Sequence, residues 1–290
     1  MTATISTTAS DRTPELSEKR EQLLAVLREM PGAVVAFSGG VDSALVAKAA
    51  VLALGERSVA VTADSPSVPR SELAGASRVA AEIGIRHVVV QTHEFDNPAY
   101  LANDGTRCYH CKSELYDTVL GLLPEFGDWV VCSGANLDDR GDYRPGLTAA
   151  AERNVRHPLQ EAGFTKADVR ALALAWELPV WDKPASPCLS SRLAPGLAVT
   201  PERTRRVEEA EAFLRSLGLK EFRVRYHEGD LARIEVHVGE LPRFAVEPLR
   251  SELATRFHAL GFKFVTLDLD GFRSGSLNEL IPLEVRTRFA

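Results

Sequence analysis

The sequence lacks the features that mark exported and membrane-spanning proteins. No apolar run approaches the roughly 20 residues that a membrane-spanning helix needs, and the first 20 residues contain no apolar core of a secretory signal. Hydrophobic residues make up 45% of the 290 residues and charged residues 26%, which is typical of a folded, soluble protein. We therefore expect a cytoplasmic protein without a membrane partner, in which residues 1–14 form a disordered leader.

Cysteine is scarce, and positive charge is not in excess. In a cytoplasmic protein the four cysteines are expected as thiols or metal ligands rather than disulfides. The formal net charge is −6, and residues 200–238 contain as many acidic as basic side chains. This balance argues against a broad nucleic-acid surface, so we expect no nucleic-acid partner.

Short apolar runs alternate with helical patterns in the first two thirds of the chain. The pattern predicts strands over 33–37, 58–64, 86–92 and 129–136, and helices over 15–30, 44–54, 70–84 and 112–123. Apolar strands joined by helices are typical of a doubly wound, mostly parallel α/β sheet. We expect this domain to span residues 15–199, with its ligands at the carboxyl ends of the strands.

The pattern changes near residue 200, and a chain of this length suits two domains. It predicts helices over 201–217 and 242–260, and strands over 221–227, 231–238 and 263–269. The short connection H-E-G-D between two of these strands favours a hairpin. Residues 200–290 are therefore expected to form a smaller α+β domain for substrate binding or oligomerisation.

A glycine-rich loop, S-G-G-V-D-S, follows the first expected strand. Between a buried strand and a helix start, such a loop presents backbone N–H groups and the positive helix end to an anion. No Lys-Ser/Thr pair follows the glycines, so the loop is not of the Walker type, nor is it G-x-G-x-x-G. The residues expected at a nucleotide are Ser38, Gly39, Gly40, Val41, Asp42 and Ser43.

This loop resembles the pyrophosphate loop of the PP-loop ATP pyrophosphatase superfamily, which includes NAD synthetases, GMP synthetases and tRNA-thiolating enzymes. S-G-A-N-L-D-D (133–139) and the stretch 157–179 are similar to further superfamily motifs, with Gly134 at the nucleotide. The resemblance implies that ATP is split into AMP and pyrophosphate, usually to adenylylate an oxygen that is then displaced. Asp42 and one of Asp138 and Asp139 are candidate ligands of Mg²⁺.

The order of these motifs with R-C-Y-H-C-K, P-C-L-S-S-R and V-T-L-D-L-D-G-F-R-S-G-S-L-N closely resembles the LarE family. LarE enzymes are the sulfur transferases of nickel-pincer nucleotide cofactor synthesis. The resemblance implies adenylylation of the carboxylates of pyridinium-3,5-biscarboxylic acid mononucleotide, followed by their conversion to thiocarboxylates. It also implies a homo-oligomer, since family members form hexamers where the assembly is known.

LarE enzymes differ in their sulfur source. One type gives up the sulfur of the cysteine equivalent to Cys188 and leaves dehydroalanine. The other holds a [4Fe-4S] cluster with three cysteines, and its open iron carries sulfide from a separate sulfur donor. Here Cys108, Cys111 and Cys188 match the cluster type, because three thiolates leave one iron open.

Other interpretations of the cysteines remain open. The three thiols with His110 also fit Zn²⁺, and Cys108 with Cys111 fits a redox pair or plain thiols. Cys132 ends an apolar strand and is expected in the core.

The expected substrate carries a phosphate and carboxylates, which guanidinium groups bind well. The candidate residues are Arg192, Arg223, Arg225 and Arg273, and a solvated strand face is the alternative for Arg223 and Arg225. Two other functions remain open, a tRNA-thiolating enzyme and a nucleotide-binding regulator without catalysis.

Overall fold

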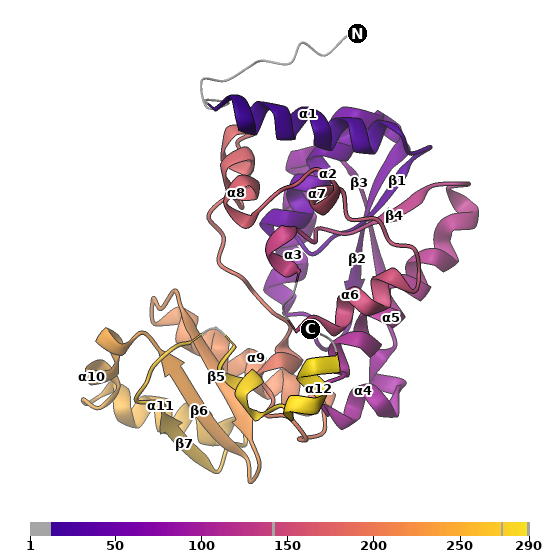
Figure 1. The fold of residues 1–290 in the computed structure, drawn as a ribbon. Helices are drawn as coiled ribbons and strands as arrows, with labels where there is room; N and C mark the ends of the chain where they lie inside the picture. The colour runs from indigo at the N-terminus through magenta and orange to yellow at the C-terminus, as the bar shows by residue number, and fades with distance from the viewer. Residues whose placement is uncertain (1–12, 141–142, 274, 289–290) are drawn as a thin grey trace.

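Four parallel strands form the first sheet of the computed structural model, which describes residues 13–140, 143–273 and 275–288 (Figure 1). They are β1 (Ala33–Ala36), β2 (Ser58–Asp64), β3 (Arg86–Gln91) and β4 (Val130–Cys132), in the order β3-β2-β1-β4. The chain moves outward from β1 to β3 and returns to the opposite side of β1 for β4. This reversal places the carboxyl ends of β1 and β4 side by side, where doubly wound sheets bind ligands.

Helices cover both faces of this sheet. One face packs on α1 (Pro14–Arg28), α2 (Val41–Leu54), α3 (Arg70–Ile83) and α8 (Lys166–Ala175), and the other on α5 (Arg107–Leu122) and α6 (Pro145–Ala151). Along β1, Ala33 and Val35 face the first group of helices and Val34 faces the second, and all three are fully buried. The predicted doubly wound α/β fold is confirmed.

Short helical segments connect these elements. They are η1 (Gly55–Arg57), η2 (Glu94–Asp96), α4 (Pro98–Ala102), η3 (Leu123–Glu125), η4 (Leu137–Asp139), α7 (Pro158–Glu161) and η5 (Leu189–Arg192). Among the residues that the structure describes, every helix is too short or too polar to span a bilayer.

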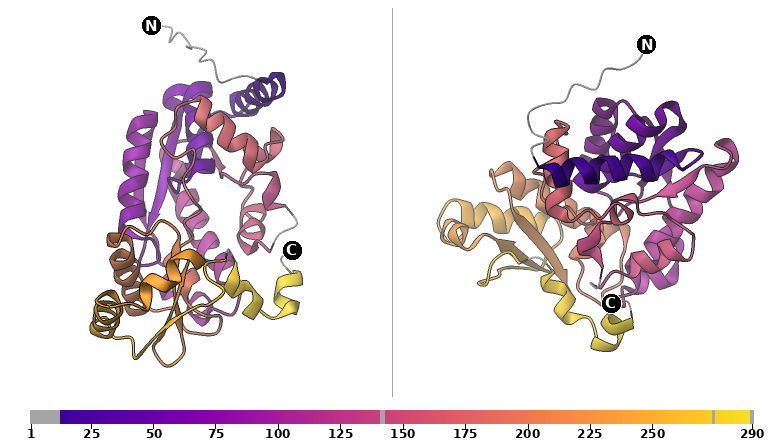
Figure 2. Two further views of the ribbon diagram at one scale, coloured as in Figure 1. Left: turned by 90° about the vertical axis from the view of Figure 1, so that its left-hand side faces the viewer. Right: turned by 45° about the horizontal axis from the view of Figure 1, so that its top comes forward.

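The second sheet contains β5 (Phe222–His227), β6 (Leu231–Val236) and β7 (Phe264–Leu267). Strands β5 and β6 are antiparallel, as the predicted hairpin requires, whereas β7 runs parallel to β6. The surrounding helices are α9 (Pro201–Ser216), η6 (Val238–Glu240), α10 (Leu241–Phe244), α11 (Leu249–Ala259), η7 (Ser276–Leu280) and α12 (Leu283–Arg288). This part of the chain lies at the end of the first sheet opposite α1 (Figures 1 and 2).

The two sheets share a boundary that involves both parts of the chain. Tyr100, Leu189 and Val199 belong to the apolar core of the second sheet, although they precede residue 200. In the opposite direction, η7 and α12 return to the first domain, where Ile281 and Val285 pack against Gly105. The domain boundary at residues 199–200 stays a prediction.

Two predicted helices differ from those observed. The prediction of one helix over 242–260 is wrong, because Pro248 lacks a backbone N–H and disfavours helical backbone in the residue before it. The helix expected from residue 112 begins at Arg107, since the polar first turn gave no apolar periodicity. Cys108 and Cys111 therefore lie on the opening turns of α5.

The packing of α2 can be tested with a matched pair of leucines on this helix. Leu45 is fully buried, whereas Leu52 is 41% exposed. We expect Leu45→Ala to lower the free energy of unfolding by about 2–5 kcal/mol, since it leaves a cavity in the core. Leu52→Ala should change it by less than about 0.5 kcal/mol. Urea denaturation followed by circular dichroism would measure both, and equal losses would contradict the assigned core.

Candidate active site

The loop between β1 and α2 is held in shape by its own serines. The Ser43 hydroxyl accepts a hydrogen bond from the Ser38 N–H at 3.2 Å and donates one to the Gly40 carbonyl at 3.1 Å. Gly39 has a φ of +68°, and a Cβ there would lie 2.7 Å from the Ala76 Cα on α3. The loop therefore presents its backbone at the start of α2, an arrangement that binds phosphate groups.

The loop after β4 lies directly against the start of α2. A Cβ at Gly134 would come within 2.7 Å of the Ser43 nitrogen and 2.9 Å of the Asp42 carbonyl carbon. The Asn136 amide donates to Asp42 Oδ1 at 3.0 Å. Gly134 thus permits the close approach of two loops that join at the candidate nucleotide site.

Two lysines that were not selected from the sequence lie at this loop. Lys166 Nζ is 2.5 Å from Asp42 Oδ2, and Lys183 Nζ is 3.2 Å from the Gly39 carbonyl oxygen. Lys183 also forms an ion pair with Glu72 at 2.7 Å. Lys166 is the first residue of α8, which lies within the stretch 157–179. Its place in that superfamily motif could have identified it from the sequence. Both cations are suitably placed to offset phosphate charge.

The candidate Mg²⁺ ligands already have protein partners. Asp42 binds Lys166 and Asn136, as described above. Asp138 Oδ2 accepts the Lys166 N–H at 2.9 Å, and Asp139 Oδ1 forms an ion pair with Arg144 at 2.8 Å. A metal ion at Asp42 would therefore have to displace the Lys166 ammonium, and the Mg²⁺ assignment stays a prediction.

The structure brings three of the four cysteines together. Cys108 and Cys111 lie on α5, and Cys188 immediately precedes η5. Burial raises the pKa of the Cys111 thiol, and negative charge on Cys188 and Cys108 raises this pKa further. Cys108 is exposed, while Cys111 and Cys188 are half-buried.

Cys132 lies elsewhere, in the core as expected. It is fully buried, and its Sγ lies 3.6 Å from the Met30 sulfur. Burial raises its pKa to about 12. Cys132 thus packs as an apolar side chain and takes no part in the group of three cysteines.

Cations surround the three grouped thiols. Arg107 donates to the Ser190 carbonyl at 2.7 Å and lies 4.0 Å from Cys108 Sγ. Burial would lower the pKa of Lys112, but the negative charges of Tyr116 and the three cysteines together raise it. Arg107 and Lys112 would offset thiolate charge, but burial outweighs them at Cys111, whose raised pKa favours the thiol in the absence of a bound metal.

Three thiols are the donor set that a [4Fe-4S] cluster with one open iron uses, so their chemistry fits such a cluster, and the cluster itself stays a prediction. Among the described residues, no three His, Cys, Asp or Glu side chains are grouped as ligands of one ion. A [4Fe-4S] cluster distributes its thiolates over separate irons, and three thiols leave one iron without a protein ligand. Arg107 and Lys112 would offset part of the negative charge that three thiolates bring.

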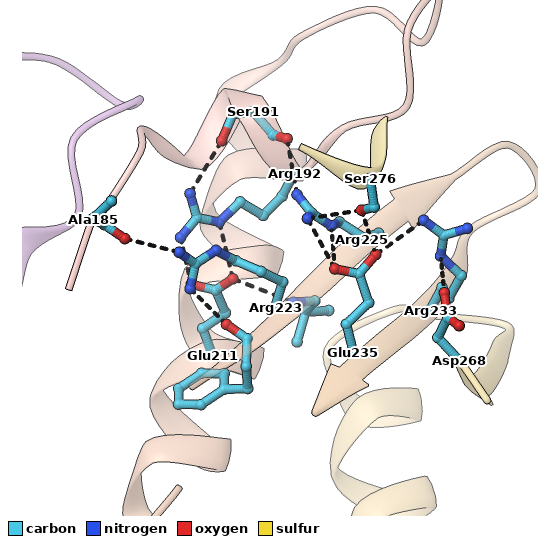
Figure 3. A network of polar contacts seen from close by, with 12 residues as sticks. Ala185, Ser191, Arg192, Glu211, Arg223, Arg225, Arg233, Glu235, Asp268 and Ser276 are labelled. Carbon is cyan, nitrogen blue, oxygen red and sulfur yellow. Dashed lines mark hydrogen bonds and ion pairs between the residues drawn. The ribbon is translucent and has the colours of Figure 1, made fainter. Parts of the chain in front are cut away.

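The four candidate arginines have different partners, and Figure 3 shows those of Arg192, Arg223 and Arg225. Arg192 is 2% exposed and forms a two-point ion pair with Glu211, while it donates to the Cys188 carbonyl at 3.0 Å. Arg225 is also buried and pairs with Glu235 at 2.8 Å. Both guanidinium groups are thus bound to carboxylates and hold the site together.

Arg223 and Arg273 are not held in buried ion pairs. Burial and the nearby charge of Arg192 lower the pKa of Arg223 to about 10. Among the described residues Arg223 forms no ion pair, and it donates to the Ala185 carbonyl at 3.0 Å (Figure 3). Arg273 is exposed and pairs with Asp270 at 3.3 Å. Of the four candidates, Arg223 is therefore the one whose positive charge is not paired with a carboxylate of a described residue.

The close approach at Gly134 can be tested by calorimetric ATP titration. Gly134→Ala should weaken ATP binding roughly 5- to 150-fold, because overpacking against the first turn of α2 costs roughly 1–3 kcal/mol. Gly121→Ala is the control, since Gly121 lies within α5 and a Cβ there meets nothing within 4 Å. Unchanged ATP affinity in Gly134→Ala would show that the β4 loop takes no part in the site.

The sequence of the chain was compared with protein families and with known proteins. The model of the NAD synthase family matches residues 21–105. The NH(3)-dependent NAD(+) synthetase of Methanococcoides burtonii is 48% identical over 60 residues, which cover 20% of this chain and 23% of that protein. The family match at residues 21–105 includes the nucleotide loop.

Two relatives match over almost their whole length. The uncharacterized protein slr1717 of Synechocystis is 47% identical over 266 residues, or 92% of this chain and 99% of that protein. The pyridinium-3,5-bisthiocarboxylic acid mononucleotide synthase of Lactiplantibacillus plantarum is 38% identical over 282 residues, or 95% and 99%. The chain therefore belongs to the LarE family of ATP-dependent sulfur transferases within the PP-loop superfamily.

Proposed function

We propose that the protein converts the carboxylates of pyridinium-3,5-biscarboxylic acid mononucleotide to thiocarboxylates, using ATP and sulfur bound at Cys108, Cys111 and Cys188. The proposal rests on the three cysteines, which α5 and the loop before η5 supply, and on Arg107, which contacts both the Ser190 carbonyl and Cys108 Sγ. The activity for which the Lactiplantibacillus relative is named supports the choice of substrate. A tRNA substrate and a silent regulator lack comparable support.

The first step activates a carboxylate. An oxygen of the substrate carboxylate attacks the α-phosphorus of ATP, which forms an acyl adenylate and releases pyrophosphate. The backbone of residues 38–43 would bind the pyrophosphate, and Lys166 and Lys183 would offset its charge as it leaves. Mg²⁺ would bind at the phosphates with Asp42 as a candidate ligand.

The second step transfers sulfur. A sulfur nucleophile attacks the acyl carbon, and AMP leaves with the electrons of the carbon–oxygen bond, because AMP is a far better leaving group than oxide. Repetition at the second carboxylate completes the product. Arg223, which forms no ion pair with any described residue, is the first candidate for the substrate phosphate or carboxylates, ahead of Arg192, Arg225 and Arg273.

We assign the sulfur source to a cluster site in this chain. Cys108, Cys111 and Cys188 would hold a [4Fe-4S] cluster, which supplies an open iron for sulfide from a separate donor. Arg107 and Lys112 offset the thiolate charge, and Arg192 orients the Cys188 loop through the carbonyl of Cys188. A sacrificial Cys188 would need neither of the other two cysteines. The homo-oligomer and the cytoplasmic location stay predictions.

The cluster assignment predicts about four irons and four acid-labile sulfides per chain in protein purified without oxygen. Cys108→Ala should lose the iron and multiple turnovers but retain ATP binding, because Cys108 lies outside the nucleotide loop. Cys132→Ala is the control and should retain its iron. An iron-free Cys108→Ala variant with full activity would refute the assignment.

The proposed role of Lys166 predicts a loss of pyrophosphate release. Lys166→Met should lower kcat by roughly 10²-fold or more, since it removes a cation aimed at developing charge. Lys19→Met is matched to it, because Lys19 forms a 2.5 Å ion pair with Asp168 on α8. A coupled pyrophosphate assay would compare the two variants, and equal rates would exclude Lys166 from the chemistry.

A further inference from the structure

A buried carboxylate outside the sites described above has only one of its oxygens paired. Glu94, in η2, is 3% exposed. Its Oε1 accepts hydrogen bonds from the hydroxyls of Ser65 at 2.6 Å and Ser67 at 3.1 Å. Its Oε2 is buried and has no hydrogen-bond partner among the described residues. Such an unpaired oxygen is unfavourable and calls for a donor.

Hydrogen bonds connect this carboxylate to the Cys188 loop. The Ser67 carbonyl accepts the N–H of Leu189, the residue after Cys188, at 2.8 Å. The segment that follows Glu94 makes a second connection, since the Tyr100 hydroxyl lies 2.7 Å from Ser190 Oγ. Glu94 thus lies in a framework that holds the Cys188 loop in place.

The segment of Glu94 packs beside Cys111. Phe95, the residue after Glu94, and Cys111 pack against the same apolar core. Among the described residues, no Lys, Arg or His forms an ion pair with Glu94. Arg107 instead donates to Asn103 and Ser190, and Lys112 lies over the Tyr116 ring at 6.0 Å. Oε2 is therefore left without a protein donor, in the framework that holds the Cys188 loop.

We propose that Glu94 belongs to a sulfur-donor subsite, where Oε2 accepts a hydrogen bond from the S–H of hydrogen sulfide or hydrosulfide. The inference rests on the proposed function, because it assumes that sulfur is bound among Cys108, Cys111 and Cys188. The two serines fix Oε1, so that the carboxylate is oriented before the ligand arrives. A carboxylate can only accept a hydrogen bond, so the subsite favours a protonated sulfur species over an anion that has no proton to donate.

The experiment is a titration of the anaerobic, iron-loaded full chain with sodium sulfide, followed by absorption. Glu94→Gln keeps the shape of the side chain but replaces the second acceptor with a donor. The half-saturating sulfide concentration should rise at least tenfold, as expected when a hydrogen bond to a charged group is lost. Iron content and the thermal midpoint should remain those of the wild type.

Two further variants separate this role from a structural one. Glu114→Gln is the control, since it neutralises a carboxylate on α5 that accepts the His93 N–H at 2.9 Å and leaves Glu94 unchanged. It should titrate within about threefold of the wild type. Ser67→Ala removes one of the two hydroxyls that orient Glu94, so its half-saturating sulfide concentration should lie between those of the wild type and Glu94→Gln. If Glu94→Gln does not fold, Glu94→Asp should show the same rise, since the shorter side chain withdraws Oε2.

The outcomes distinguish the inference from the proposed function. An iron-loaded Glu94→Gln or Glu94→Asp variant that titrates like the wild type would overturn the role of Glu94 alone. Equal loss of iron in Glu94→Gln and Ser67→Ala would show that the carboxylate is only structural. A wild-type chain without iron would refute the cluster site, and the subsite would fall with it.

Discussion

A buried ion pair between Arg192 and Glu211 holds the Cys188 loop against the second sheet. Arg192 binds the carbonyls of Pro187 and Cys188, while Glu211 on α9 also accepts the Val224 N–H of β5 at 3.2 Å. Removal of one partner from such a pair typically costs about 3–5 kcal/mol, because the other charge is left buried and unpaired. The position of the third cysteine therefore depends on the second part of the chain, even though its thiol lies beside α5.

The strand order determines how the rest of the site assembles. Reversal between β1 and β4 joins the glycine loop to Gly134, and the same sheet edge receives the segments after β2 and β3. Those segments contain Ser65, Ser67 and Glu94, and the chain then leads through α4 to the two cysteines of α5. One edge of one sheet thus joins a phosphate-binding loop to a group of thiols, which is the geometry that activation followed by sulfur transfer requires.

Much of this arrangement could be predicted, because apolar runs and glycine loops act locally. The strand over 58–64 is observed with those bounds. The joint role of Cys108, Cys111 and Cys188 stays a prediction. Long-range pairing could not be predicted. Arg192 and Arg225 were selected as anion-binding cations, yet their carboxylate partners come from other elements, Glu211 on α9 and Glu235 on β6. Glu94 lies in the polar sequence H-E-F-D, which gives no sign of its burial.

The central claim is that sulfur reaches the adenylylated carboxylate from a cysteine-bound site that can be recharged. Turnover with heavy-isotope sulfide, followed by mass spectrometry of both product and protein, tests it most directly. The account predicts heavy sulfur in the thiocarboxylate product and an unchanged chain mass after many turnovers. Light sulfur in the product, with loss of one sulfur from Cys188 of each chain, would contradict it.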